Sequence, residues 1–141
     1  MSSSFPDPWL DDLGLLPAVD WHAREVWKRT GLVVNVAASG PLEDLPDEHK
    51  TCIYRVVQEA LHNVVQHAEA GVVRIMIERQ ASSVRVSIQD DGRGFDPLRH
   101  KGLGLVGLQE RVENLKGTVL VHSAEGRGTM LDIQLPLPDS L

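Results

Sequence analysis

The sequence predicts an α+β protein in which helices cover one face of a mixed, mostly antiparallel sheet. The signals follow the order helix–strand–helix–strand–strand–loop–helix–strand–strand, an arrangement typical of two packed layers. A helical stripe of apolar residues runs through 53–68, and apolar and polar residues alternate through Val84–Ile88. Together these patterns predict a two-layer α/β sandwich with about five strands and about three helices.

The first half of the chain carries two helices with a strand between them. The first helix is predicted over 13–30, with Pro17 in its first turn, where proline is tolerated, and Gly31 as its stop. A β-branched strand follows over 32–37. The second helix has the clearest spacing (i, i+3, i+4, i+7 and onward), carried by Ile53, Val56, Val57, Ala60, Leu61, Val64, Val65 and Ala68.

The second half carries four strands and one helix. Strands are predicted over 72–78 and 84–89, joined by a hairpin, and over 118–122 and 130–135. A glycine-rich loop occupies roughly 92–104. A third helix then follows, marked by Leu105, Leu108, Val112 and Leu115 and closed by Gly117. The tryptophans are expected to be packing residues: Trp9, Trp21 and Trp27.

The composition describes one domain, since 141 residues with 42% hydrophobic content suffice for a core. The net charge of −6 argues against a nucleic-acid partner, and a single cysteine, Cys52, excludes an internal disulfide. No apolar run approaches the ~20 residues that cross a bilayer. We expect a cytoplasmic domain over 13–137, without membrane contact of its own, flanked by a flexible tail at 1–12 and a short tail at 138–141.

The turn that follows the strand at 84–89 is the most informative stretch. Asp90 stands at the strand's end, and Gly92 and Gly94 follow it. A buried carboxylate there can accept a hydrogen bond from an exocyclic amine. The glycines allow the backbone to pass close to a flat ligand, because they have no Cβ. By itself the pattern is a turn; beside other motifs it indicates an adenine pocket.

Two polar residues of the second helix, Glu59 and Asn63, are candidates for chemistry. They are four residues apart and therefore lie on one side of the helix, beside the apolar stripe. An Asn oxygen is a suitable ligand for Mg²⁺, which usually keeps several waters and bridges to phosphates. A Glu one turn earlier can orient or deprotonate a water or an incoming group. The alternative interpretation is a solvated polar helix face.

The run from Gly102 to Gly107 matches G-x-G-x-x-G, yet a dinucleotide site is excluded because the run does not directly follow a strand. The helix after it still presents free N–H groups and a positive dipole end, which suit phosphate. Arg111 is expected either to approach phosphate or to pair with Glu110 or Glu113. A Gly126-Arg127-Gly128-Thr129 turn precedes the last strand and offers a hydroxyl.

In order and spacing, four motifs resemble the N, G1, G2 and closing glycine–threonine boxes of sensor histidine-kinase catalytic domains, members of the Bergerat-fold ATPases. They are Glu59-x-x-x-Asn63, Asp90-x-Gly92-x-Gly94, Gly102-x-Gly104-Leu105 and Gly126-x-Gly128-Thr129. Two longer runs, 58–68 and 102–112, resemble the nitrate-sensor type of these kinases. The short stretch between Phe95 and Gly102, without a phenylalanine box, suits that type. The resemblance covers about 13–137.

The resemblance implies ATP and Mg²⁺ as ligands. It implies that Asp90 binds the adenine amine, that Asn63 ligates Mg²⁺, and that Thr129 lies near adenine. Glu59 matches the position of the general base in the hydrolysing relatives, and it can reach the metal through water. The remaining residues implied to contact ATP are His67, Gly92, Gly94, Gly102, Leu103, Gly104, Leu105, Arg111 and Gly128.

The resemblance also implies that the γ-phosphoryl group goes to a histidine on a separate dimerisation domain and then to a response regulator. His22, the only upstream histidine, is not followed by an acidic residue, so we expect the acceptor domain outside this chain. The chain alone is expected to be a monomer and the full-length protein a dimer. The alternatives are an anti-sigma-factor serine kinase, which shares these boxes, and a non-catalytic ATP-sensing domain.

Overall fold

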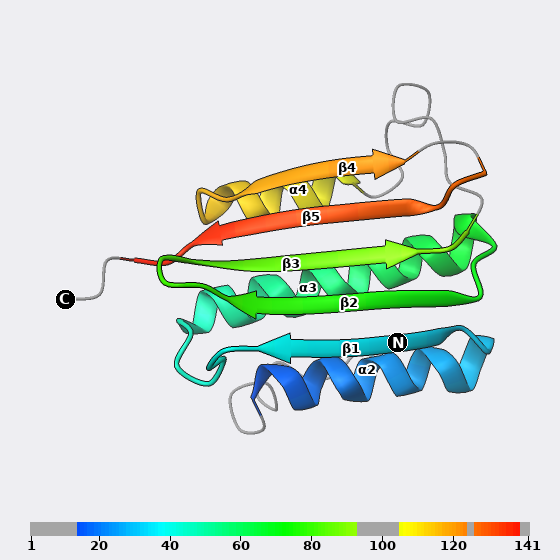
Figure 1. Ribbon diagram of the computed structural model, residues 1–141, viewed down its shortest axis with the longest axis horizontal. Coiled ribbons are helices and arrows are strands. Elements are labelled where there is room, and N and C mark those ends of the chain that lie inside the picture. Colours follow the sequence, from blue (N-terminus) through cyan, green and yellow to red (C-terminus); the bar gives the residue numbers. More distant parts are fainter. Residues whose placement is uncertain (1–13, 93–104, 124–125, 139–141) are drawn as a thin grey trace.

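The computed structural model describes residues 14–92, 105–123 and 126–138. Within them the helices and strands occur in the predicted order (Figure 1). The elements are α2 (Leu15–Thr30), β1 (Val33–Ser39), α3 (Asp47–Asn63), the π-helix η1 (Val64–Ala68), β2 (Val72–Arg79), β3 (Ser83–Asp90), α4 (Leu105–Asn114), β4 (Thr118–Ser123) and β5 (Thr129–Pro136).

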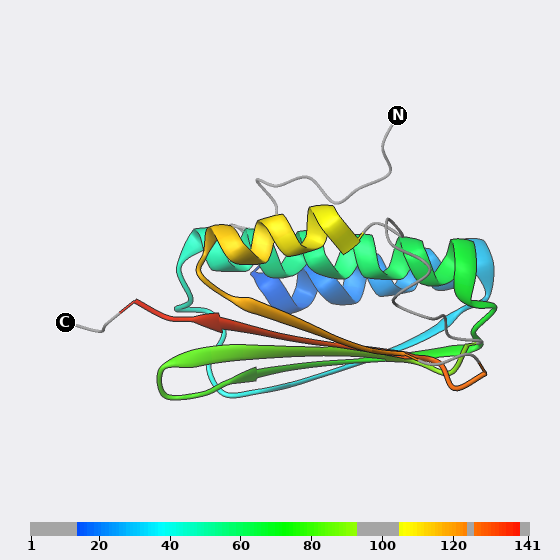
Figure 2. The ribbon, with the colours of Figure 1, turned by 90° about the horizontal axis from the view of Figure 1, so that it is seen from above.

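The strands form one mixed sheet in the order β1-β2-β3-β5-β4. β1 and β2 are parallel, and the three other neighbouring pairs are antiparallel. Because β5 lies between β3 and β4, its first residue, Thr129, pairs with Asp90, the last residue of β3. Helices α2, α3 and α4 all lie on one face of this sheet (Figure 2), so the predicted fold class is confirmed.

The core lies between the helices and the sheet and is almost entirely aliphatic. Alternate residues of β2 and β3 face it, and the α3 stripe covers them. The buried residues of these three elements include Val73, Ile75, Ile77, Val84, Val86, Ile88, Ile53, Val56, Val57, Ala60 and Leu61. Burying such side chains supplies most of the stabilisation, since each contributes about 1.5–3 kcal/mol.

The predicted stripe does not continue unchanged to its end. Val64 is buried, whereas Val65 is 41% exposed. The α-helix α3 ends at Asn63, and a single π-helical turn, η1, follows it. A π-turn holds more residues than an α-turn and so rotates those that follow. The expectation of one regular stripe through 68 was therefore wrong at Val65.

Trp27 is 55% exposed, so its expected packing role was wrong. Val26, its neighbour in α2, faces the core, and one residue along a helix turns the side-chain direction by about 100°, which carries Trp27 out of the core. Trp21 is partly buried against the core, as expected. Trp9 lies outside the described residues.

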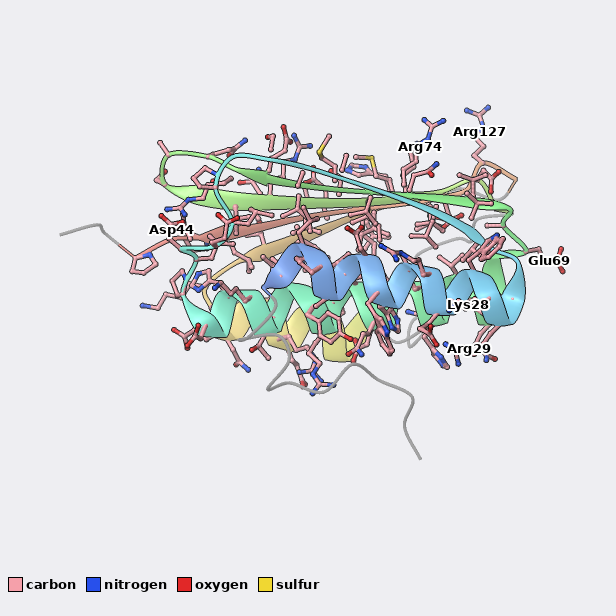
Figure 3. The ribbon with its side chains drawn as sticks, turned by 90° about the horizontal axis from the view of Figure 1, so that it is seen from below. Lys28, Arg29, Asp44, Glu69, Arg74 and Arg127 are labelled. Carbon is pink, nitrogen blue, oxygen red and sulfur yellow. The ribbon has the colours of Figure 1, made fainter. Side chains whose placement is uncertain are left out.

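The face of the sheet that carries no helix is mostly polar and partly exposed. Arg74 and Arg127 point away from the helices there (Figure 3). Arg85 donates two hydrogen bonds, of 2.9 and 2.8 Å, to the carboxylate of Asp132 on the neighbouring strand. This pair holds the pKa of Asp132 below its usual range.

Gly117 connects α4 to β4 at a point where no side chain fits. A Cβ at this position would lie 2.4 Å from the carbonyl oxygen of Gln134 on β5. Its N–H donates to the carbonyl of Val112 over 2.9 Å, which closes the helix. The predicted helix stop is thus also a point where the chain passes close to the backbone of β5.

Candidate functional site

Asp90 ends β3 on the helix-covered side of the sheet and is only 8% exposed. Its carboxylate accepts hydrogen bonds from the N–H of Gly92, over 2.8 Å, and from the N–H of Thr129. Burial raises the pKa of Asp90, and the two backbone amides oppose that rise. The result is a fixed, partly desolvated acceptor at the end of a central strand.

Gly128 brings β5 against Asp90. Its φ is +76°, and a Cβ there would lie 2.3 Å from the carbonyl oxygen of Asp90. Glycine is the residue that tolerates both conditions. The Ser123 hydroxyl lies 2.9 Å from the Thr129 hydroxyl and donates to the Gly128 carbonyl over 3.1 Å. Sequence reasoning missed Ser123, because only the β4–β5 register places it beside Thr129.

Asp91, the neighbour of Asp90, has a structural role that was not predicted. Its carboxylate accepts hydrogen bonds from the N–H groups of Gly71 (2.9 Å) and Val72 (3.0 Å), where β2 begins. Its own N–H donates to the carbonyl of Val72 over 3.2 Å. These amides lower the pKa of Asp91. The two consecutive acidic residues therefore have different roles. Asp90 is buried in the site, and Asp91 connects β3 to β2.

Glu59 and Asn63 lie on one side of α3, as predicted, and both are half-buried. The Glu59 Oε1 lies 3.7 Å from the Nε of Arg111 on α4. The Glu59 Oε2 is buried and has no hydrogen-bond partner. A Cβ on Gly107 would lie 3.4 Å from Oε1, so α4 passes close to this carboxylate. Arg111 thus meets Glu59 on another helix, whereas the sequence suggested Glu110 or Glu113.

The position of α4 against α3 is set by packing. Leu108 and Val112 are fully buried, and the Cys52 thiol donates to the Arg111 carbonyl over 3.7 Å. Burial raises the pKa of the Cys52 thiol to about 11, an effect that the nearby Arg111 opposes. Cys52 is therefore a neutral packing residue at physiological pH.

The predicted site residues fall into three groups. Asp90, Gly92, Gly128 and Thr129 meet at one end of the sheet. α3, which carries Glu59 and Asn63, runs toward that same end (Figure 1). The third group comprises positions that the structure leaves open. Gly94, Gly102, Leu103 and Gly104 lie outside the described residues, Leu105 begins α4 and His67 lies in η1. Their contacts with ATP, and that of Arg111 with phosphate, stay predictions.

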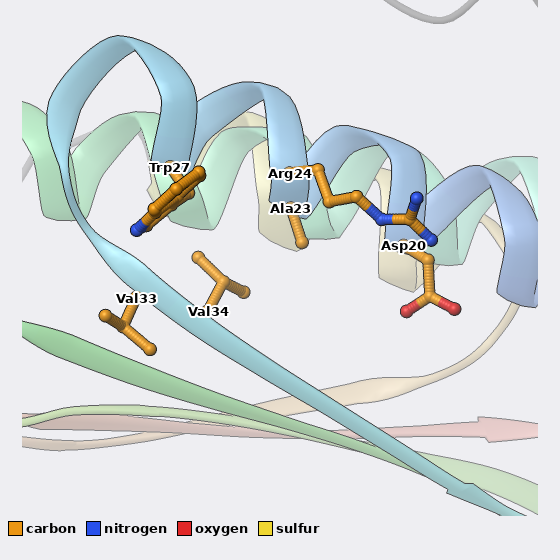
Figure 4. A pocket seen from close by; sticks show the side chains of 6 residues that line it. All are labelled: Asp20, Ala23, Arg24, Trp27, Val33 and Val34. Carbon is orange, nitrogen blue, oxygen red and sulfur yellow. The ribbon is translucent and has the colours of Figure 1, made fainter.

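A groove of about 340 Å³ opens elsewhere, between α2 and the edge strand β1 (Figure 4). Its lining consists of Asp20, Ala23, Arg24, Trp27, Val33 and Val34. None of the predicted site residues lines it. In the part of the chain that the structure describes, no three His, Cys, Asp or Glu side chains gather to hold a metal ion. Nor does any helix of that part have the length and apolar character to cross a membrane.

The helix-covered mixed sheet and the motifs at its end define an ATPase domain class. Residues 48–139 match the family described as histidine kinase-, DNA gyrase B- and HSP90-like ATPase, and the chain belongs to this family. The recognition of a histidine-kinase-type ATP-binding domain is confirmed, including the fold that it implied.

The relatives at higher identity are sensor kinases. The histidine-protein kinase/phosphatase DegS of Brevibacillus brevis is 38% identical over 91% of this chain and 34% of its own length. The oxygen sensor histidine kinase NreB of Staphylococcus carnosus is 35% identical over 92% of this chain and 38% of its own length. The chain therefore spans little more than a third of these curated relatives.

Solved structures agree with this assignment. The histidine kinase domain of the blue-light activated kinase EL346 from Erythrobacter litoralis superposes with a TM-score of 0.70 at 25% identity. The match covers 87% of this chain and 61% of that one. The catalytic domain of the histidine kinase ThkA has the same fold, with a TM-score of 0.67 at 20% identity over 87% of this chain and 91% of that one.

Proposed function

We propose that this domain binds ATP with Mg²⁺ and donates the γ-phosphoryl group to a histidine on a separate dimerisation and phosphoacceptor domain. The buried Asp90 carboxylate carries the proposal, because it is a fixed hydrogen-bond acceptor in a family of ATPases. Adenine presents an exocyclic amine that such an acceptor can bind. Guanine presents a carbonyl at that position and would leave the carboxylate without a donor, so GTP is disfavoured.

The residues present fit a nucleotide bound with a metal. Gly128 has no side chain and so leaves the space next to the Asp90 backbone open. The next residue, Thr129, offers a hydroxyl. Asn63, half-buried on α3, offers the amide oxygen that would hold Mg²⁺, and phosphates and water would complete the coordination. Mg²⁺ supplies charge neutralisation during phosphoryl transfer, and the protein mainly positions the groups.

The acceptor histidine is proposed to lie outside this chain. His22 lies against Tyr54, with ring centroids 6.1 Å apart, and its Nδ1 is buried without a hydrogen-bond partner. Burial lowers the pKa of His22, with Arg29 acting in the same direction. A ring packed in this way is poorly placed to receive a phosphoryl group. We further propose relay to a response regulator, dimerisation through the acceptor domain, and a cytoplasmic site of action, where ATP is available.

Calorimetric titration of Asp90→Asn with ATP and with GTP tests the site. An Asn at this position keeps an oxygen for the amides of Gly92 and Thr129 but turns an N–H₂ group toward the adenine amine. ATP binding should weaken by about 1–3 kcal/mol, and the preference over GTP should shrink. The melting temperature should not fall, because the variant no longer buries a charge. The control is Asp44→Asn, at the opposite end of the sheet. Unchanged ATP affinity in Asp90→Asn would refute the adenine assignment.

A further inference from the structure

We propose that Arg111 is a positioning residue that holds the Glu59 carboxylate, and that this role replaces the contact with the nucleotide that the resemblance implies for it. The inference rests on the proposed function and on the role of general base that the resemblance implies for Glu59. Three observations carry it: the contact between the two side chains, the burial of one carboxylate oxygen, and the anchoring of the arginine backbone.

The contact joins two helices at the level of Glu59. The Arg111 Nε lies 3.7 Å from the Glu59 Oε1, and Gly107, one turn earlier on α4, leaves room for the carboxylate. A side chain larger than a methyl group at Gly107 would enter the space that the carboxylate occupies. Helix α4 thus places the Arg111 guanidinium next to the Glu59 carboxylate, and Gly107 leaves the space that this carboxylate occupies.

The carboxylate has little else to hold it. The Glu59 Oε2 is buried without a hydrogen-bond partner, so it is free to accept a proton or to orient a polar group of the reaction. A long side chain with one unpartnered oxygen samples several rotamers unless the other oxygen is fixed. In the proposal, the guanidinium of Arg111, whose Nε lies 3.7 Å from Oε1, restrains that other oxygen.

The arginine is held in turn by its own backbone. Its carbonyl accepts the Cys52 thiol, and Val112 beside it is fully buried. Arg111 also lies about two turns along α4 from Leu105, where the free N–H groups of the helix begin. An arginine devoted to phosphate would be better placed at that N-terminus. Its side chain instead points across to α3.

Both partners are partly solvent-accessible, with side-chain exposures of 46% and 34%, so the pair contributes little to folding stability. Arg111→Gln should therefore fold normally. Its effect should appear in turnover, because a misplaced reactive group slows a reaction without weakening the binding of substrate.

The test is a double-mutant cycle in the full-length protein that carries this domain, with phosphotransfer from labelled ATP as the assay. Arg111→Gln should lower kcat by about tenfold while the Kd for ATP stays within about twofold. Arg111→Lys, which keeps the charge, should recover part of the rate. Combined with Glu59→Gln, the arginine substitution should have no further effect. A higher Kd for ATP with kcat preserved, or an equal loss of rate in the Glu59→Gln background, would overturn the proposal.

A second measurement does not depend on the kinase reaction. In NMR spectra of the 141-residue chain, the Arg111 Nε–H signal should shift in Glu59→Gln, while the signal of Arg74, on the opposite sheet face, should not. An Arg111 signal that is insensitive to Glu59→Gln would contradict the contact itself. If the contact holds but the full-length protein transfers no phosphoryl group, the proposed function fails and the pairing stands.

Discussion

Asp90 shows how a single residue can oppose folding and serve binding. Burial raises its pKa, so the ionised carboxylate opposes folding near neutral pH. The sign follows from linkage: a raised pKa contributes stability below the unfolded-state value and loses it as pH rises through the folded value. The amides of Gly92 and Thr129 offset part of this cost and keep the carboxylate directed. A hydrogen bond from a ligand amine would offset more of the cost of burying this carboxylate.

Asn63 is the residue on which the metal proposal depends. It follows Glu59 by one turn and precedes the π-turn η1, a distortion frequent at functional sites. The π-turn therefore begins immediately after the proposed Mg²⁺ ligand. In a regular α-helix, the side chains of the residues after Asn63 would point in different directions from those they take in η1.

We expect Asn63→Ala to weaken ATP binding by about tenfold in the presence of Mg²⁺, which corresponds to ~1.4 kcal/mol. With EDTA in place of Mg²⁺, the variant should bind ATP almost as the unsubstituted chain does, because the lost contact is to the metal. Calorimetry under both conditions measures the difference, with His62→Ala, its exposed neighbour, as the control. Equal losses under both conditions would remove Asn63 from the metal site.

At the scale of elements, Asp91 connects the end of β3 to the start of β2. Its carboxylate accepts the N–H groups of Gly71 and Val72, which immediately precede and begin the strand. The same segment supports β1, because the carbonyl of Gly71 accepts the N–H of Val33 over 3.1 Å. One carboxylate thus helps to fix three strands next to Asp90, and so supports the position of the site.

The lowered pKa of Asp91 makes this support dependent on pH. A carboxylate whose pKa is lower in the folded state contributes stability above its usual value of 3.8 and loses it as pH falls through the folded value. Asp91→Ala should therefore melt below the unsubstituted chain at pH 7, and the gap should narrow below about pH 4. Thermal unfolding followed by circular dichroism at pH 7, 5 and 3 measures it. A gap that stays constant across this range would contradict the role.

At the scale of the whole molecule, local patterns predicted the architecture well. The 3.6-residue stripe and the strand alternation each report which face is buried, so element order and sheet type could be predicted. Asp90 could be placed because a residue at the end of an alternating strand has a defined side. The Arg111 partner and the role of Ser123 could not, because both depend on which elements become neighbours in space. Trp27 was mispredicted because a large apolar side chain was assumed to be buried.

The chain covers little more than a third of its curated relatives. The proposed destination of the phosphoryl group is a histidine on a separate domain. Serine kinases and ATP sensors with the same motifs remain the competing functions. They differ from a histidine kinase in the product, since phosphohistidine is lost in acid and kept in alkali, whereas phosphoserine behaves in the opposite way.

The most direct measurement is phosphotransfer from γ-labelled ATP to the acceptor domain of the full-length protein. The account predicts ATP- and Mg²⁺-dependent label on a histidine, lost in acid, stable in alkali and strongly reduced in Asp90→Asn. Label on a serine of a partner protein, or ATP binding without any transfer, would contradict it.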